Sequence, residues 1–151
     1  MIRDHALDPA ALVIDPIPFV ACLQLCQAAF ALDDAELGAR AVEALAPHRV
    51  LWAHYFMFVV GPISWALGLA QAAAGDLDRA VLELDEAMAK LVAVGMLGHV
   101  PTLRIDLALV LRKRCGPGDA ERGTEQLAIG REEAALLHAD ALVAELERLL
   151  A

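Results

Sequence analysis

The stretch LGLAQAAAGDLDRAVLELDEA, residues 67–87, sets the fold expected for this chain of 151 residues. Apolar residues recur three or four positions apart on both sides of Gly75-Asp76, which is the spacing of amphipathic helices. Glycine ends a helix well and aspartate opens one well, so this pair predicts a tight turn between two helices. The small Gly68 and Ala80 would let the two helices approach closely. Three apolar residues fill the seam between them: Leu67, Leu84 and Ala87. The stretch therefore predicts an antiparallel helical hairpin.

The same order of features occurs twice more in the chain. A later copy places Leu107-Ala108 before a turn at 116–119 and the small residue Gly123. An earlier and weaker copy places Leu25-Cys26 before Asp33-Asp34 and Gly38. Self-similarity of this kind is typical of stacked helical hairpins, each of which buries its apolar face on its neighbours. We expect three degenerate copies and a closing helix.

These motifs resemble tetratricopeptide-type repeats, and in particular the helical-repeat region of large bacterial ATP-binding transcriptional regulators and adenylate cyclases. The resemblance covers about residues 19–150. It departs at Ser64, where such repeats usually have tryptophan, with Trp65 one place later. It implies an all-α fold of antiparallel helical hairpins, stacked as a short tetratricopeptide-like solenoid. The implied function is non-catalytic: protein–protein interaction or self-association, as the accessory part of a signalling or transcription regulator. First helices line the concave face of such repeats, which implies a groove that includes Trp65, Leu69, Ile105 and Arg112.

Prolines, glycines and aspartates divide the whole chain into short segments. We expect a single domain over 1–151, with an irregular lead-in over the proline-containing residues 1–18. Asp33-Asp34, Asp76 and Asp119 are expected to cap or open the helices that follow them. No segment carries a strand pattern strong enough to predict a sheet, although residues 48–60 are rich in β-branched and aromatic side chains. Helices are expected over seven ranges: 19–32, 35–46, 63–74, 78–94, 101–114, 120–138 and 140–150.

Composition and charge favour a protein partner and argue against nucleic acid and a membrane. Hydrophobic residues make up 59% of the chain, so part of its surface is expected to meet another protein or a second copy of itself. The net charge of −9 argues against nucleic acid, because phosphate contacts need clustered lysine and arginine, and Arg112-Lys113-Arg114 is the only tight basic cluster. Residues 50–75 carry no charged side chain, yet Gly61-Pro62 interrupts them, which favours two separate elements over a membrane span.

Three cysteines and the lack of a leader pattern predict a reduced, cytoplasmic protein. Cys22 and Cys26 stand four residues apart on one predicted helix face, but further metal ligands are missing nearby, so we expect core packing and no metal site. No glycine-rich loop ends in Lys-Ser or Lys-Thr, and no cofactor or catalytic residues are predicted.

The best candidate for a ligand contact is the aromatic segment 51–58. Concentrated aromatic side chains beside a histidine suit a small apolar or aromatic ligand, or a partner's anchoring residue. The alternative is a hydrophobic linker that fills the space between helix pairs. A small-molecule sensor or a small all-helical enzyme built on these aromatics therefore stays open beside the interaction domain. The candidate residues of this segment are Trp52, His54, Tyr55 and Phe58.

Overall fold

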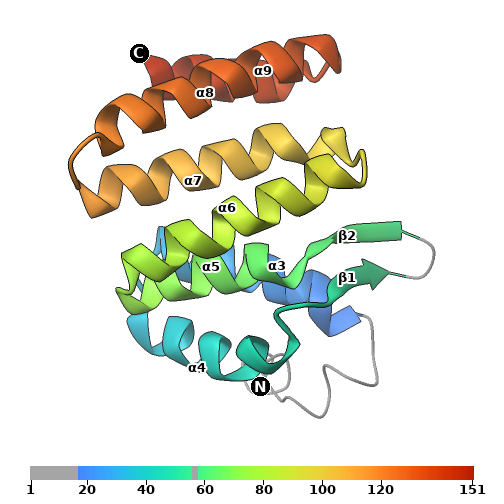
Figure 1. Ribbon diagram of the computed structural model, residues 1–151, viewed down its shortest axis with the longest axis vertical. Coiled ribbons are helices and arrows are strands. Elements are labelled where there is room, and N and C mark those ends of the chain that lie inside the picture. The colour runs from blue at the N-terminus through green and yellow to red at the C-terminus, as the bar shows by residue number, and fades with distance from the viewer. Residues whose placement is uncertain (1–16, 56–57) are drawn as a thin grey trace. The chain divides into compact units, whose positions relative to one another are not determined.

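The computed structural model describes the backbone of residues 17–55 and 58–151 (Figure 1). The described side chains are those of residues 22–53 and 60–151, so most of the expected lead-in lies outside them. The chain divides into two compact units, residues 1–87 (unit 1) and 88–151 (unit 2). The expected single-domain organisation stays a prediction.

The described part of unit 1 is helical apart from one short hairpin, and its helices follow one another in sequential pairs. Helices α3 and α4 both pack against α5. In chain order its elements are α3 (Ile17–Ala31), α4 (Ala35–Leu45), the 3-10 turn η1 (Ala46–His48), β1 (Trp52–Tyr55), β2 (Phe58–Pro62), α5 (Ile63–Ala74) and the larger part of α6 (Leu77–Ala93).

Helix α5 is the centre of unit 1. Every residue from Ile63 to Ala73 is buried, as is usual for a helix that is apolar on all sides. Two glycines allow neighbouring helices to come close to it. A Cβ atom placed on Gly38 of α4 would lie 2.7 Å from the backbone nitrogen of Ala74. A Cβ on Gly68 would lie 3.1 Å from the carbonyl oxygen of Ala80 in α6, which confirms the predicted α5–α6 hairpin.

The expected all-α architecture has one exception in the structure. Strands β1 and β2 form an antiparallel hairpin, in which Trp52 pairs with Pro62 and Ala53 with Gly61. A register irregularity follows Ala53. The aromatic and β-branched residues noted between 48 and 60 favour strands, and two adjacent strands can pair locally although each is too short to give a clear alternating pattern.

Most predicted helix ends are confirmed. Asp34 caps α4 by accepting a hydrogen bond from the Leu37 backbone N–H at 3.0 Å. Gly75 ends α5 with φ +94°, a conformation that favours glycine, and Asp76 accepts from the Arg79 N–H at the start of α6. Asp119 differs from the prediction: it is the first residue of α8, Gly118 takes the cap position, and the Asp119 carboxylate bonds elsewhere.

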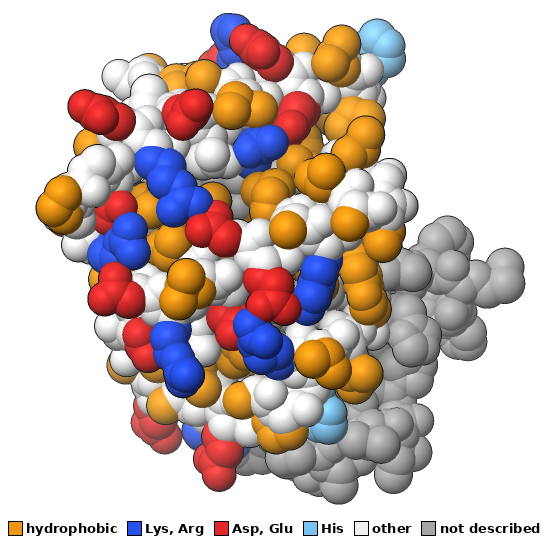
Figure 2. Space-filling model, in the orientation of Figure 1, with side chains coloured by type: hydrophobic (Ala, Val, Ile, Leu, Met, Phe, Trp, Pro, Cys, Tyr) orange, Lys and Arg blue, Asp and Glu red, His pale blue; other side chains and the backbone are white. Residues whose placement is uncertain are grey.

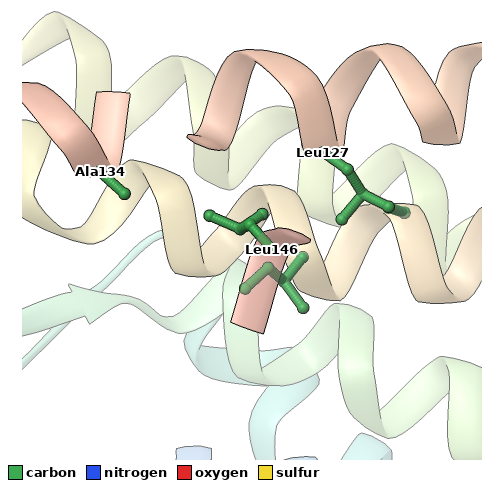
Figure 3. Packing of buried hydrophobic residues seen from close by; sticks show 5 residues of the cluster. Leu127, Ala134 and Leu146 are labelled. Carbon is green, nitrogen blue, oxygen red and sulfur yellow. The ribbon is translucent and has the colours of Figure 1, made fainter. Parts of the chain in front are cut away.

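Unit 2 contains the end of α6, the 3-10 turn η2 (Leu97–His99), α7 (Val100–Arg114), α8 (Asp119–Leu136) and α9 (Asp140–Leu150). Helix α7 packs against α8, and α8 against α9. Their shared core includes Ile105, Leu127, Ala134 and Leu146, of which the last three are labelled in Figure 3. No helix of the described residues is both long and apolar enough to span a bilayer.

Candidate functional site

Two of the predicted groove residues of unit 1 lie in its interior. Trp65 and Leu69 are 2% and 0% exposed in α5, and a Cβ on Gly61 would lie 3.2 Å from the Trp65 ring. Trp52 is half-buried in β1. The side chains of His54, Tyr55 and Phe58 lie outside the described residues. A pocket formed by this aromatic segment stays a prediction.

The two predicted groove residues of unit 2 have different surroundings. Ile105 packs into the unit 2 core and is 9% exposed. Arg112 is exposed, and its Nη2 donates to the Leu149 carbonyl at 3.2 Å. That the residues of both units line one groove stays a prediction.

Arg112 also borders a pocket of about 300 Å³ between α7 and α8. We call it the Arg112 pocket. Its floor is apolar and includes Ala108, Leu111 and Leu127, which are all buried. Polar groups at its edge include Arg112 and Thr124. The sequence-based reasoning selected Arg112 for its helix face but missed the cavity, because a cavity depends on how far apart two helices pack.

The most exposed leucines of unit 2 gather around a second, smaller pocket. We call this the leucine face and define it by Leu97, Leu136 and Leu137, which are 55%, 82% and 45% exposed. With Val100 and Glu133 they line a pocket of about 130 Å³. In Figure 2, hydrophobic side chains gather where α6 connects to α7 and α8 connects to α9.

Sequence-based reasoning missed the leucine face. The available signal was Leu136-Leu137, two apolar residues beyond the charged run that includes Arg131, Glu132 and Glu133. Leu136 and Leu137 lie at the C-terminal end of α8, where no following turn of the same helix covers them. The periodic pattern alone cannot tell whether a neighbouring segment covers them.

An ion pair joins α7 and α8 beside the leucine face. The Nε and Nη2 atoms of Arg104 each donate to a different carboxylate oxygen of Glu133 at 2.8 Å. Arg104 Nη1 also donates to Gln126 Oε1 at 2.5 Å. Two parallel charge-assisted bonds fix the direction of both side chains. The Glu133 wall of the pocket is therefore held in place and its charge is balanced.

A second charged group closes the α7–α8 turn. Asp119 is 3% exposed, and its two carboxylate oxygens accept from Arg114 at 2.8 and 2.6 Å. The Gly116 backbone N–H also donates to it at 2.7 Å. The hydrogen bonds from Arg114 lower the pKa of Asp119 to about 2, and the bond from Gly116 acts in the same direction. The turn is thus tied to a carboxylate that stays charged at neutral pH.

The paired cysteines of α3 offer no reactive thiolate. Cys22 and Cys26 are both fully buried and form no disulfide. Burial raises the pKa of the Cys22 thiol to about 11 and raises that of Cys26 as well. Thiols that are protonated at neutral pH are poor metal ligands and nucleophiles. Across residues 17–55 and 58–151, no three His, Cys, Asp or Glu side chains gather in a way that could hold a metal ion.

The interior of unit 1 also holds polar atoms without hydrogen-bond partners among the described residues. They include Ser64 Oγ and Gln71 Oε1 of α5. Ser64 and Gln71 lie on the same helix face as Gly68, which contacts α6. Leaving such a group unpaired costs about 1–3 kcal/mol.

Comparison with protein-family models, with curated proteins and with solved structures gave no match to this chain. The geometry of the two surfaces of unit 2 therefore carries the functional argument.

Proposed function

We propose that this chain is a non-catalytic helical domain for protein–protein interaction, and that it associates with a second copy of itself through the leucine face. One observation carries this proposal: Leu136, at 82% exposure, stands at the edge of an apolar pocket. Burying a leucine side chain stabilises by about 1.5–3 kcal/mol, so three exposed leucines at one place favour a covered state.

The second copy is the occupant that this surface favours. In a two-fold dimer the same patch meets itself, so a protrusion must lie beside a matching recess. The leucine face offers both, because Leu136 protrudes next to the pocket that Leu97 and Val100 help to line. Each copy can place its Leu136 in the pocket of the other.

Charge also allows two copies of unit 2 to meet. Residues 88–151 carry nine acidic and eight basic side chains, whereas residues 1–87 carry twelve acidic and four basic ones. Like charges that face each other across an interface oppose association. Contact through the nearly neutral unit 2 avoids most of this repulsion.

The resemblance to tetratricopeptide-type repeats supports an interaction role. Sequentially paired antiparallel helices present surfaces for binding in such scaffolds. We propose, on the same ground, that the chain acts as the accessory part of a bacterial signalling or transcription regulator.

Sedimentation equilibrium of Leu136→Asp tests the dimer. We expect the wild-type chain to dimerise at micromolar concentration and the variant to stay monomeric, with the dissociation constant raised about 100-fold or more, because both copies lose a buried leucine. The matched control is Leu32→Asp, which changes a leucine of unit 1 that is 78% exposed and should leave the dimer intact.

Circular dichroism must show an unchanged helical content for both variants, so that a loss of association is not a loss of folding. A wild-type chain that stays monomeric at 100 micromolar or more, or a Leu136→Asp variant that dimerises as tightly as wild type, would overturn the proposed dimer.

A further inference from the structure

We propose that the Arg112 pocket binds a small carboxylic acid with a short aliphatic chain, a function separate from the proposed self-association. The pocket lies between the C-terminal half of α7 and the first turns of α8, and all of its lining residues belong to unit 2. Its volume of about 300 Å³ is at the lower end of the range for small-molecule sites.

The aliphatic floor of the pocket favours a ligand with an aliphatic chain. Ala108 and Leu111 of α7 face Leu127 of α8, and each of the three is 3% exposed or less. No aromatic side chain lines the pocket, so the floor offers aliphatic contact but no ring stacking. An unbranched hydrocarbon chain can lie over this aliphatic base without leaving a polar group of its own unpaired.

The guanidinium group of Arg112 favours a ligand that carries a carboxylate. Its one hydrogen bond goes to the exposed carbonyl of Leu149, and no carboxylate of the described residues pairs with it. A guanidinium group binds a carboxylate through two parallel hydrogen bonds.

The acidic residue of the pocket does not cancel this preference. Asp119 lines it, but both of its oxygens already accept from Arg114 at 2.8 and 2.6 Å. The charge of Asp119 is therefore balanced by a neighbour other than Arg112. The same bonds, with the one from Gly116, hold the turn at the end of the pocket in a single conformation.

Titration of the full chain with hexanoate, followed by backbone amide NMR, tests the proposal. We expect saturable shifts at Gly116, Gly123 and Thr124, with a dissociation constant of about 1 mM for so small a ligand. Hexanamide keeps the chain but lacks the charge, and acetate keeps the charge but lacks the chain. Each should bind at least about ten-fold more weakly than hexanoate.

Two variants connect the shifts with the pocket. Arg112→Gln should weaken hexanoate binding about ten-fold or more but leave hexanamide binding unchanged. Ala120→Leu places a larger side chain at an exposed lining position and should weaken both ligands. Arg131→Gln is the control, because it removes an exposed arginine of α8 that does not line the pocket.

Equal binding of hexanoate and hexanamide, or hexanoate binding that survives Arg112→Gln, would overturn the assignment. So would the absence of saturable shifts at these three amides. A dimer that dissociates on Leu136→Asp, with hexanoate binding unchanged, would keep the two functions separate.

Discussion

Unit 1 and unit 2 differ in how closely their helices pack at a glycine. In unit 1, α4 lies so close to α5 that a Cβ on Gly38 would meet the Ala74 nitrogen at 2.7 Å and the Ala73 Cβ at 2.8 Å. In unit 2, a Cβ on Gly123 would find its nearest neighbour, the Ala108 carbonyl oxygen, at 3.5 Å. That is an ordinary van der Waals distance. At Gly123, α7 and α8 are thus farther apart than α4 and α5 are at Gly38.

Charged side chains link neighbouring elements in both units: Arg49 bonds Glu83 and Glu86 of α6 in unit 1, and two arginines of α7 make similar links in unit 2. Arg104 joins Glu133 and Gln126 across α7 and α8, and Arg114 joins Asp119 at their turn. Long charged side chains can bridge a gap that direct helix contact would close. In the described residues, α4 and α5 of unit 1 pack closely, and two pockets lie along α8 of unit 2.

The largest effect is expected from Gly38→Ala. The new methyl group would overlap backbone atoms of α5, so the two helices must move apart, at a cost of about 2–3 kcal/mol. Urea denaturation followed by tryptophan fluorescence measures the loss, because both tryptophans of the chain, Trp52 and Trp65, belong to unit 1.

Gly123→Ala is the matched control for this loss. Its methyl group fits at 3.5 Å, and alanine favours a helix over glycine by about 1 kcal/mol, so stability should stay equal or rise. Far-UV circular dichroism during urea denaturation gives the value. A Gly123→Ala variant as unstable as Gly38→Ala would remove the difference in spacing between the two units.

A smaller loss is expected from Arg104→Met, which keeps the apolar stem but removes the bonds to Glu133 and Gln126. The Arg104 side chain is only 14% exposed, and we expect a loss of about 2 kcal/mol. Thermal and urea denaturation measure it. Arg148→Met breaks the exposed pair with Glu145 and should leave stability almost unchanged, because water and salt screen exposed charges. Equal losses in both variants would show that the Arg104 bridge does not hold unit 2 together.

The smallest effect is the acid dependence of the Asp119 bonds. Because folding lowers the pKa of Asp119 from 3.8 to about 2, the charged form stabilises the folded state above pH 4. This contribution should be lost as pH falls from about 4 to 2. Thermal denaturation of wild type and Asp119→Asn should show a melting-temperature difference at pH 7 that shrinks over this range. A difference that is constant from pH 7 to 2 would contradict the assignment.

Much of the local structure could be predicted, because it depends on neighbours in the chain. The helices predicted over 63–74 and 140–150 have these same bounds in the structure. Asp34 and Gly75 act at helix ends as expected, since capping and left-handed turns involve only a few adjacent residues. The β1–β2 hairpin was not predicted, because each strand is stabilised mainly by its partner and not by its own pattern.

The candidate site could be predicted only in part. Arg112 was expected in the groove that the repeat resemblance implies, and in the structure it borders a pocket between α7 and α8. Trp65 was expected at a groove and is 2% exposed. A helical face can be read from residue spacing, but the spacing does not say whether another helix covers that face.

The sequence by itself determined the helical class, the position of most turns and the close approach of Gly68 to Ala80, because periodicity and turn chemistry act over a few residues. Only the tertiary structure decided that Asp119 binds Arg114 instead of capping α8, and that Leu136 stays exposed while Leu127 is buried. Both outcomes depend on which segments meet in space. Whether a side chain is buried or paired depends on those neighbours, and they cannot be identified from its position in the sequence.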